Sequence, residues 1–538
     1  MRNPKTMVYM LCVAAFLAGC AATKVDSGLD FGRNTHADVL IRNGRVIDGT
    51  GNSWYVADLA IRNGKVAAIG KLDHFNATRI INADGQIVAP GFIDVHAHIE
   101  FGLFDNPTAN NYVHDGVTTV ITGNCGGSAD SLKDFFTRID STGTSINVAS
   151  LVGHNTVRRQ TMGLANRAAS EADIAKMQSL VESAMKAGAV GISTGLIYLP
   201  GVYSNTDEVV ALSRAAAKHN GVYASHIRNE GSKVTEAINE ALNVGRAAKM
   251  PVQISHFKVS APANWGRSRE TLALIEGARR EGIDVTIDQY PYTASSTSLG
   301  IMLPDWAREG GEKAVVLRIT SEVTRPKIAA EILATARQSK RADFSYAVVA
   351  RYAPDPTLNG KSIKAINILK GRADTMEAGA ETVLDLLTKG EAQMVYHGMS
   401  EDDVAYFMAY PFNMIGGDGG VQNGKGMPHP RSYGTNARVL ARYVREQKII
   451  GLEEAIRRMT SLAAQKFQLK GRGLLREGFA ADIVIFDEKT VQDRATFENP
   501  HQFSTGFSHV LVNGKVVLAD GKHSGVRSGV ALRGPAAQ

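Results

Sequence analysis

Histidines, one cysteine and one aspartate occur in this chain at positions that suit metal chemistry. His96 and His98 close the run GFIDVHAH, and residues two apart on a strand point to the same face. Asp94 shares that face. Imidazole and thiolate are preferred ligands of Zn²⁺, and a carboxylate serves as a general base or a hard ligand. The other candidates of these types are Cys125, His226, His256 and Asp418.

His226 and His256 occur in matching contexts. Each follows a serine at the end of a short apolar run, and the two lie 30 residues apart, the length of one β/α unit. Either histidine alone could be a hydrogen-bonded core residue. Two consecutive strands that both end in Ser-His favour a shared site.

Cys125 and Asp418 each stand between glycines, which allow close backbone approach and unusual dihedral angles. The thiol could be a metal ligand, a nucleophile or an inert buried group. Ligation fits better than nucleophilic attack, because no His–Asn or His–Asp pair stands apart from the histidine set. The carboxylate of Asp418 is either a turn former or a positioned base.

These residues require elements that bring them together. Strand-like runs alternate with helix-like ones, which predicts an α/β fold with a (β/α)₈ TIM-like barrel and its active site at the carboxyl ends of the strands. Helices are expected at 171–187, 207–219, 233–249, 269–281 and 451–469. The eight expected strands end near His98, Cys125, His154, Thr194, His226, His256, Tyr290 and Asp418.

Strands seven and eight are separated by far more than an ordinary connection, so we expect an inserted subdomain at about 299–391. Asn-Gly pairs between β-branched runs predict hairpins at 41–46 and 61–66, with a third copy at 512–516. The simplest account is a small β-sandwich built from both chain ends, residues 37–90 and 471–525, around a barrel at 91–470. Two unrelated hairpin pairs are the alternative.

The first twenty residues are typical of an export signal. Arg2 and Lys5 precede an apolar run at 7–18 that is too short for a comfortable membrane span. The stretch Leu17-Ala18-Gly19-Cys20 resembles a bacterial lipobox, so we predict that residues 1–20 are a lipoprotein-type signal peptide and that Cys20 is lipidated. A plain secretory peptide is the alternative.

Residues 21–36 then form a polar tether. Ala21 resembles the outer-membrane sorting class, which predicts an outer-membrane lipoprotein facing the periplasm, or otherwise a periplasmic or secreted protein. Of the three cysteines, Cys12 leaves with the signal and Cys20 takes the lipid. Cys125 is then without a disulfide partner in an oxidising compartment, which favours burial or ligation.

The overall charge gives little support to a nucleic-acid partner. The chain of 538 residues has a formal charge of +7 from 60 basic and 53 acidic residues, without a dense basic block or a stacking motif. Contact with a membrane is expected only through the N-terminal lipid. The oligomeric state stays open.

Taken together, the motifs resemble the N-acyl-D-amino-acid deacylase (D-aminoacylase) family of the amidohydrolase superfamily. The similarity runs from about Ala37 to Lys522 and rests on PGFIDVHAH, GNCG, GISTGL, the two Ser-His strands, YPYT and GDG. The superfamily usually has a carbamylated lysine or a glutamate at the end of strand four. Ser193-Thr194 stands there in this chain, and in this deacylase branch the strand-two cysteine is understood to take over metal ligation.

The resemblance implies a role for each site residue. Cys125, His226 and His256 would hold a tightly bound zinc ion, and His96 and His98 a second, weaker metal position. Asp418 would take a proton from the attacking water and return it to the leaving amine. Lys258, Tyr290, Ser296 and Arg431 are the candidates for binding the substrate carboxylate.

The expected substrate is a small N-acyl-D-amino acid, cleaved to a carboxylate and a free D-amino acid. The stretch 293–304 has no charged residue, which predicts a preference for hydrophobic side chains if it lines the side-chain pocket. The preference for D substrates comes from the resemblance alone. The rivals are a D-aminopeptidase or dipeptidase, a cyclic-amide hydrolase, or a non-catalytic scaffold of the same fold.

Overall fold

A computed structural model describes residues 35–537 of the chain. The predictions about the signal peptide, Cys20 and nearly all of the tether concern residues outside this range. Within the described range, none of the helices combines the length and apolar character needed to span a membrane.

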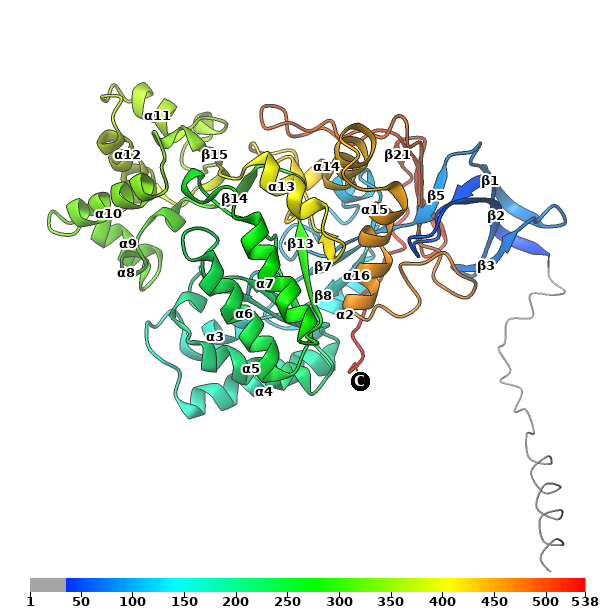
Figure 1. Cartoon of the computed structure of the whole chain (residues 1–538), viewed down its shortest axis with the longest axis horizontal. Helices are drawn as coiled ribbons and strands as arrows, with labels where there is room; N and C mark the ends of the chain where they lie inside the picture. The colour runs from blue at the N-terminus through cyan, green and yellow to red at the C-terminus, as the bar shows by residue number, and fades with distance from the viewer. Residues whose placement is uncertain (1–34, 538) are drawn as a thin grey trace, which may run out of the picture.

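The barrel is confirmed, and its eight strand positions are all parallel where they pair (Figure 1). β8 and β9 are two pieces of one strand, because Leu151 between them donates its N–H to Thr122 O at 2.9 Å. The circle closes where Ala97 pairs with Gly419. The strands are β6 (Phe92–Asp94), β7 (Val117–Thr122), β8 (Asn147–Ser150), β9 (Val152–Gly153), β10 (Gly191–Gly195), β11 (Val222–His226), β12 (Val252–Ile254), β13 (Val285–Gln289) and β17 (Asn413–Ile415).

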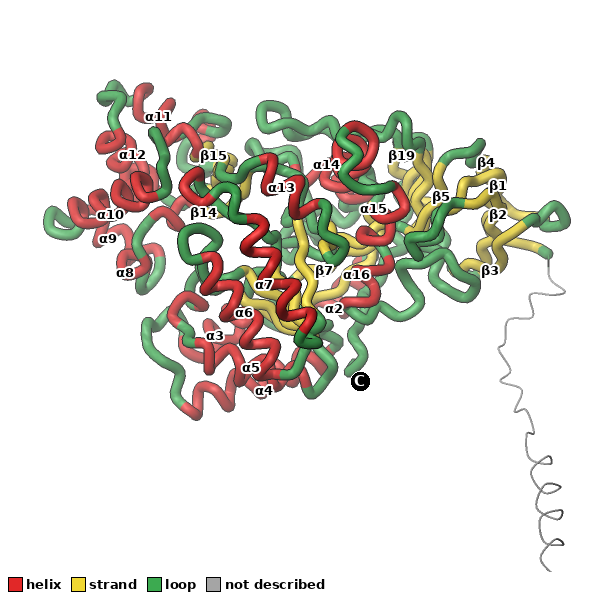
Figure 2. The backbone as a smooth tube through the Cα atoms, viewed as in Figure 1, coloured by secondary structure: helices red, strands yellow, loops and turns green. Residues whose placement is uncertain are grey.

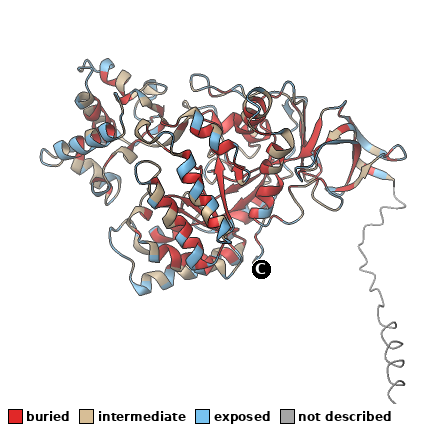
Figure 3. Ribbon diagram, viewed as in Figure 1, coloured by how far each residue is buried: buried red, intermediate tan, exposed pale blue. Residues whose placement is uncertain are grey.

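The barrel strands are buried along their whole length, as parallel strands covered on both faces must be, and helices surround them (Figures 2 and 3). The helix predicted at 171–187 is confirmed, and it begins with a capping box between Ser170 and Asp173. The helices around the barrel are α1 (Asn110–Val113), α2 (Leu132–Thr142), α3 (His154–Met162), α4 (Glu171–Ala187), α5 (Thr206–Ala217), α6 (Val234–Ala248), α7 (Ser268–Arg280), α13 (Glu401–Met408), α14 (Arg431–Arg438), the π-helix η6 (Val439–Glu446), and the short 3₁₀ turns η1 (Gly201–Tyr203) and η2 (Pro262–Asn264).

The single helix predicted at 451–469 is wrong. Two helices, α15 (Leu452–Met459) and α16 (Ser461–Lys466), occupy this stretch. Thr460 between them has φ −133° and ψ −86°, which interrupts the helical backbone. The Thr460 hydroxyl donates to Ile456 O at 2.6 Å, and the Ser461 hydroxyl donates to Gly49 O at 2.6 Å.

Strands from both chain ends join in one nine-stranded sheet beside the barrel (Figure 1). β5 and β18 form its junction, where Val88 pairs with Ile485 in antiparallel register. The sheet contains β1 (His36–Val46), β2 (Tyr55–Arg62), β3 (Lys65–Gly70), β4 (Asn76–Asn82), β5 (Ile87–Pro90), β18 (Ile483–Phe486), β19 (Phe507–Val512), β20 (Lys515–Ala519) and β21 (Lys522–His523).

Two of the three Asn-Gly hairpins are confirmed, between β2 and β3 and between β19 and β20. The hairpin predicted at Asn43-Gly44 is wrong, because β1 continues through this pair as a β-bulge. A two-residue type I′ turn needs positive φ at both central residues. Asn63 and Gly64 meet that condition with φ 51° and 75°, whereas only Asn43 of the first pair does, with φ 58°.

The insertion between β13 and β17 has its own core and projects from the side of the barrel away from β1–β3 (Figure 1). Its three-stranded sheet reaches beyond the expected 299–391 at both ends, because β14 and β16 pair at its base. It contains β14 (Ala294–Ser298), η3 (Leu299–Met302), α8 (Asp305–Arg308), α9 (Glu312–Thr320), α10 (Arg325–Gln338), η4 (Phe344–Tyr346), β15 (Ala347–Arg351), η5 (Pro356–Leu358), α11 (Ile363–Leu369), α12 (Met376–Lys389) and β16 (Gln393–His397).

Candidate metal centre

The predicted donors converge at the carboxyl ends of the barrel strands, in the segments that follow β6, β7, β12 and β17 and at the last residue of β11. Three of them have left-handed backbones: φ is 51° at Cys125, 36° at His256 and 47° at Asp418. Such conformations are unfavourable for these residue types and persist only where the surrounding structure enforces them. The backbone therefore aims these three side chains at one point.

Cys125, His226 and His256 form one group of donors. The Cys125 sulfur lies 3.6 Å from Nδ1 of His226 and 3.5 Å from Nε2 of His256. A tetrahedral zinc ion, with Zn–S near 2.3 Å and Zn–N near 2.05 Å, places sulfur and nitrogen about 3.5 Å apart. The spacing of these three residues therefore fits zinc.

His96, His98 and Asp418 form the adjoining part of the site. Nε2 of His96 lies 3.3 Å from the Cys125 sulfur and 3.6 Å from Oδ1 of Asp418. Nε2 of His98 lies 3.1 Å from the same carboxylate oxygen. His96 is fully buried and the side chain of His98 is 38% exposed, so the position that they share opens to solvent on one side.

The electrostatics favour ionised forms of both Cys125 and Asp418. Burial alone would raise the pKa of the Cys125 thiol, but His96 and His256 outweigh it and hold that pKa well below its ordinary range. Burial likewise opposes ionisation of Asp418, whose pKa is nevertheless held well below the ordinary value by Arg431 and His96. A thiolate is the form of cysteine that binds metal.

The four predicted substrate-binding residues all line the cleft above these donors. Nη2 of Arg431 lies 2.9 Å from Oδ2 of Asp418, and its guanidinium lies over the ring of Tyr290. The Lys258 ammonium lies 2.6 Å from Oε1 of Glu230 and 2.6 Å from Nδ1 of His256. The Ser296 hydroxyl already donates to Met394 O at 2.7 Å, so its side chain is engaged within the insertion.

Two functional carboxylates were missing from the predicted set. Glu230 lies 3.0 Å from Nδ1 of His256 and follows His226 by four residues. Asp288 lies 3.3 Å from Nδ1 of His96 and accepts the backbone N–H of His256 at 2.8 Å. Carboxylates of this kind orient metal-binding histidines. A signal was present for Asp288, which lies on the strand that leads to Tyr290.

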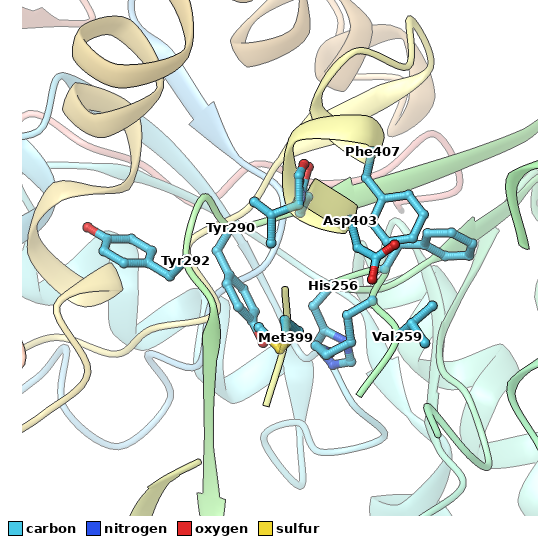
Figure 4. A pocket seen from close by; sticks show the side chains of 11 residues that line it. His256, Val259, Tyr290, Tyr292, Met399, Asp403 and Phe407 are labelled. Atoms are coloured by element: carbon cyan, nitrogen blue, oxygen red, sulfur yellow. The ribbon is translucent and has the colours of Figure 1, made fainter. Parts of the chain in front are cut away.

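The cleft has a volume of about 1200 Å³ and reaches from the barrel rim to the insertion. A second, smaller pocket lies beside it and shares His256, Lys258 and Tyr290 with the cleft (Figure 4). Figure 4 shows His256 and Tyr290 near Met399, with Val259 and Phe407 beyond His256. The large cleft, which is lined by Cys125, His226, His256 and Asp418, gives ligands access to the donors.

Comparison with known proteins identifies the family of the chain. A family model described as "Amidohydrolase family" matches residues 79–518, and the chain belongs to that family. It is 35% identical to a D-aminoacylase of Alcaligenes xylosoxydans xylosoxydans, over 93% of this chain and 98% of that protein.

Two solved structures are similar throughout. One is a D-aminoacylase studied for its binuclear metal centre, 34% identical, with a TM-score of 0.79 over 92% of this chain and 100% of that one. The other is the N-acyl-D-glutamate deacylase of Bordetella bronchiseptica with zinc and a phosphonate inhibitor, 36% identical, with a TM-score of 0.79 over 93% and 100%. The resemblance inferred from the motifs is thus confirmed.

Proposed function

We propose that the protein is a zinc-dependent hydrolase that converts N-acyl-D-amino acids to a carboxylate and a free D-amino acid. One observation carries the proposal. Beside a donor set that fits zinc, the hydroxyl of Tyr290 and Nη1 of Arg431 are buried with no hydrogen-bond partner among the described residues. Buried polar groups of this kind are costly unless a ligand satisfies them. The α-carboxylate of an N-acyl amino acid would accept from both.

The residues of the chain divide the chemistry between them. Cys125, His226 and His256 would hold the zinc ion, which when bound supplies a Lewis acid for the amide carbonyl. Asp418 accepts the proton of the attacking water and delivers it to the nitrogen of the leaving amine, which departs as a neutral amine. Arg431 and Tyr290 hold the α-carboxylate, so the amide is fixed over the donors.

Support for D stereochemistry comes from the relatives, whose printed names are those of D-amino-acid deacylases. Support for a hydrophobic side chain comes from the cleft wall nearest the insertion. There the uncharged strand β14 is joined by the side chains of Ile197, Ile301 and Tyr396. A leucine-like side chain would find apolar contacts on this wall.

One observation favours acidic side chains as a second candidate. Arg351 lines the same cleft, where its stem packs against Gly426, the neighbour of Lys425. Arg351 is exposed and is without an ion-pair partner among the described residues. A relative that is 36% identical is an N-acyl-D-glutamate deacylase.

A substrate panel decides between these candidates and their rivals. N-acetyl-D-leucine, N-acetyl-D-glutamate, their L isomers, a D-dipeptide and a hydantoin are compared by kcat/KM in zinc-loaded protein. We expect N-acetyl-D-leucine to be cleaved at least about tenfold better than the others. Preference for N-acetyl-D-glutamate, lost in Arg351→Ala, would support the acidic candidate, and cleavage of the hydantoin alone would overturn the proposal.

We also propose that the protein is exported and anchored by lipid at Cys20. The lipobox-like Leu17-Ala18-Gly19-Cys20 supports this. The full-length protein and its Cys20→Ser variant are expressed and fractionated. We expect the wild type in the outer membrane and the variant unprocessed or released. Identical processing and retention of the two would contradict lipidation.

A further inference from the structure

We propose that Phe101 contacts the acyl group of the substrate and makes the enzyme favour acyl chains longer than acetyl. This inference rests on the proposed function. It begins from the exposure of Phe101, whose side chain lines the catalytic cleft and is 91% exposed. An isolated exposed apolar residue is ordinary, but this one stands at the rim of the site and is held in place.

The turn that carries Phe101 is held by buried neighbours and by hydrogen bonds. Ile99 and Leu103 are fully buried, and the N–H of Leu103 donates to Ile99 O at 3.0 Å. Oε1 of Glu100 accepts from the hydroxyl of Thr122 and from the N–H of Gly123, both at 2.6 Å. The aromatic ring is therefore presented by a fixed backbone, which keeps the entropic cost of binding low.

The direction of the acyl chain follows from the other contacts. The α-carboxylate belongs with Tyr290 and Arg431, and the side chain with the wall near the insertion. One sector of the remaining rim is formed by the loops after β6 and β7 and by α3. We place the acyl group in this sector when the amide lies over the metal donors.

Several polar side chains in this sector already donate hydrogen bonds within the protein, although Oδ1 of Asn124 is buried without a partner among the described residues. Nδ2 of Asn124 donates to Ile121 O at 2.9 Å, that of Asn155 to Gly195 O at 3.1 Å, and Oγ1 of Thr156 to Ser128 O at 3.2 Å. Among the described residues that line the sector, Phe101 has the one large apolar side chain.

Val421, on the neighbouring loop after β17, extends this apolar surface. It also lines the cleft, and it lies against Gly102, where an added Cβ would come within 3.1 Å of Val421 O. Phe101 and Val421 thus offer an apolar lip at the cleft, and a longer acyl chain would cover more of it than an acetyl group does. Longer acyl chains would bury it and gain hydrophobic free energy.

The test is a chain-length series of N-acetyl-, N-butyryl- and N-hexanoyl-D-leucine. For the wild type we expect kcat/KM to rise by about two- to fourfold for each added methylene group. Phe101→Ala should abolish the rise, and Phe101→Leu should retain most of it. Leu317→Ala is the matched control, because Leu317 is 72% exposed in α9 and does not line the cleft.

Binding gives a second readout that needs no turnover. In Asp418→Asn protein, calorimetry should show that affinity rises with acyl length, and that the rise is lost when Phe101→Ala is added. The inference is overturned if kcat/KM of the wild type does not change with acyl length, or if Phe101→Ala lowers kcat/KM equally for every substrate. In either case the proposed function still stands as long as N-acetyl-D-leucine is cleaved. Absence of both cleavage and binding for all three substrates overturns the proposed function, and this inference with it.

Discussion

Single residues in this site are set mainly by the backbone that carries them. Cys125 lies in the sequence Gly123-Asn124-Cys125-Gly126, in which both glycines have φ 76°. A Cβ at Gly126 would meet Asn155 Oδ1 at 2.3 Å, so glycine is required there. The thiol is thus placed between His226 and His256 by a loop that few other sequences could form.

The first prediction concerns the proton carrier. Asp418→Asn should lower kcat by about 10²- to 10⁴-fold, because an amide cannot accept the proton of the attacking water. Zinc content should stay at the wild-type value, since the donor group proposed to hold zinc consists of Cys125, His226 and His256 and does not include Asp418. The check is steady-state kinetics with metal analysis of the same sample, and an unchanged kcat would exclude the proposed role.

A second prediction separates the two metal positions. Cys125→Ala should weaken zinc binding more than about a hundredfold, because it removes a ligand and not merely a group that orients one. His98→Ala should leave one tightly bound zinc per chain. Competition with a chelator measures both affinities. The assignment of the tight position would be reversed if His98→Ala lost zinc and Cys125→Ala kept it.

Elements differ in how well sequence could predict them. Strand ends at His226 and His256 were visible because each strand is a short buried apolar run that ends in a polar pair. The bulge at Asn43 and the helix break at Thr460 could not be predicted from the sequence. Both depend on contacts made by distant parts of the chain, with β4 and β5 in one case and with Gly49 in the other.

The site was predictable for the same reason that the strands were. The proposed metal ligands stand at or just after strand ends, where residue type and position both mark them. Glu230 carries no such mark, because it lies in a loop and its role appears only when Lys258 and His256 approach it at 2.6 and 3.0 Å. The contact of Glu230 with His256 is therefore visible only in three dimensions, whereas Asp288 could have been found from its place on the strand that leads to Tyr290.

A third prediction tests the bulge. Gly44→Ala should destabilise the sheet domain by about 1–3 kcal/mol, because the added Cβ would come within 2.5 Å of Val88 Cγ2. Gly277→Ala in α7 is the matched control, since the space around it is open and alanine favours a helix. Thermal unfolding of the two variants checks this, and equal melting temperatures would count against the tight packing at Gly44.

At the scale of the whole molecule, parts distant in sequence complete one site. The loop after β17 and the start of α14 bring Asp418 and Arg431 to the proposed ligands, which follow β6, β7 and β12 or end β11. The insertion supplies the opposite cleft wall. The nine-stranded sheet joins the two ends of the chain beside the barrel. In the proposed function, substrate binding, proton transfer and metal ligation thus all depend on one closed barrel.

The most direct test of the central claim is a zinc titration of the metal-free protein with paired substrates. Hydrolysis of N-acetyl-D-leucine and N-acetyl-L-leucine is followed in the same samples. We predict that D activity rises from near zero and saturates at about one zinc per chain, while L activity stays below about a hundredth of it. Full D activity without metal, or L activity equal to D activity, would contradict a zinc-dependent D-amino-acid deacylase.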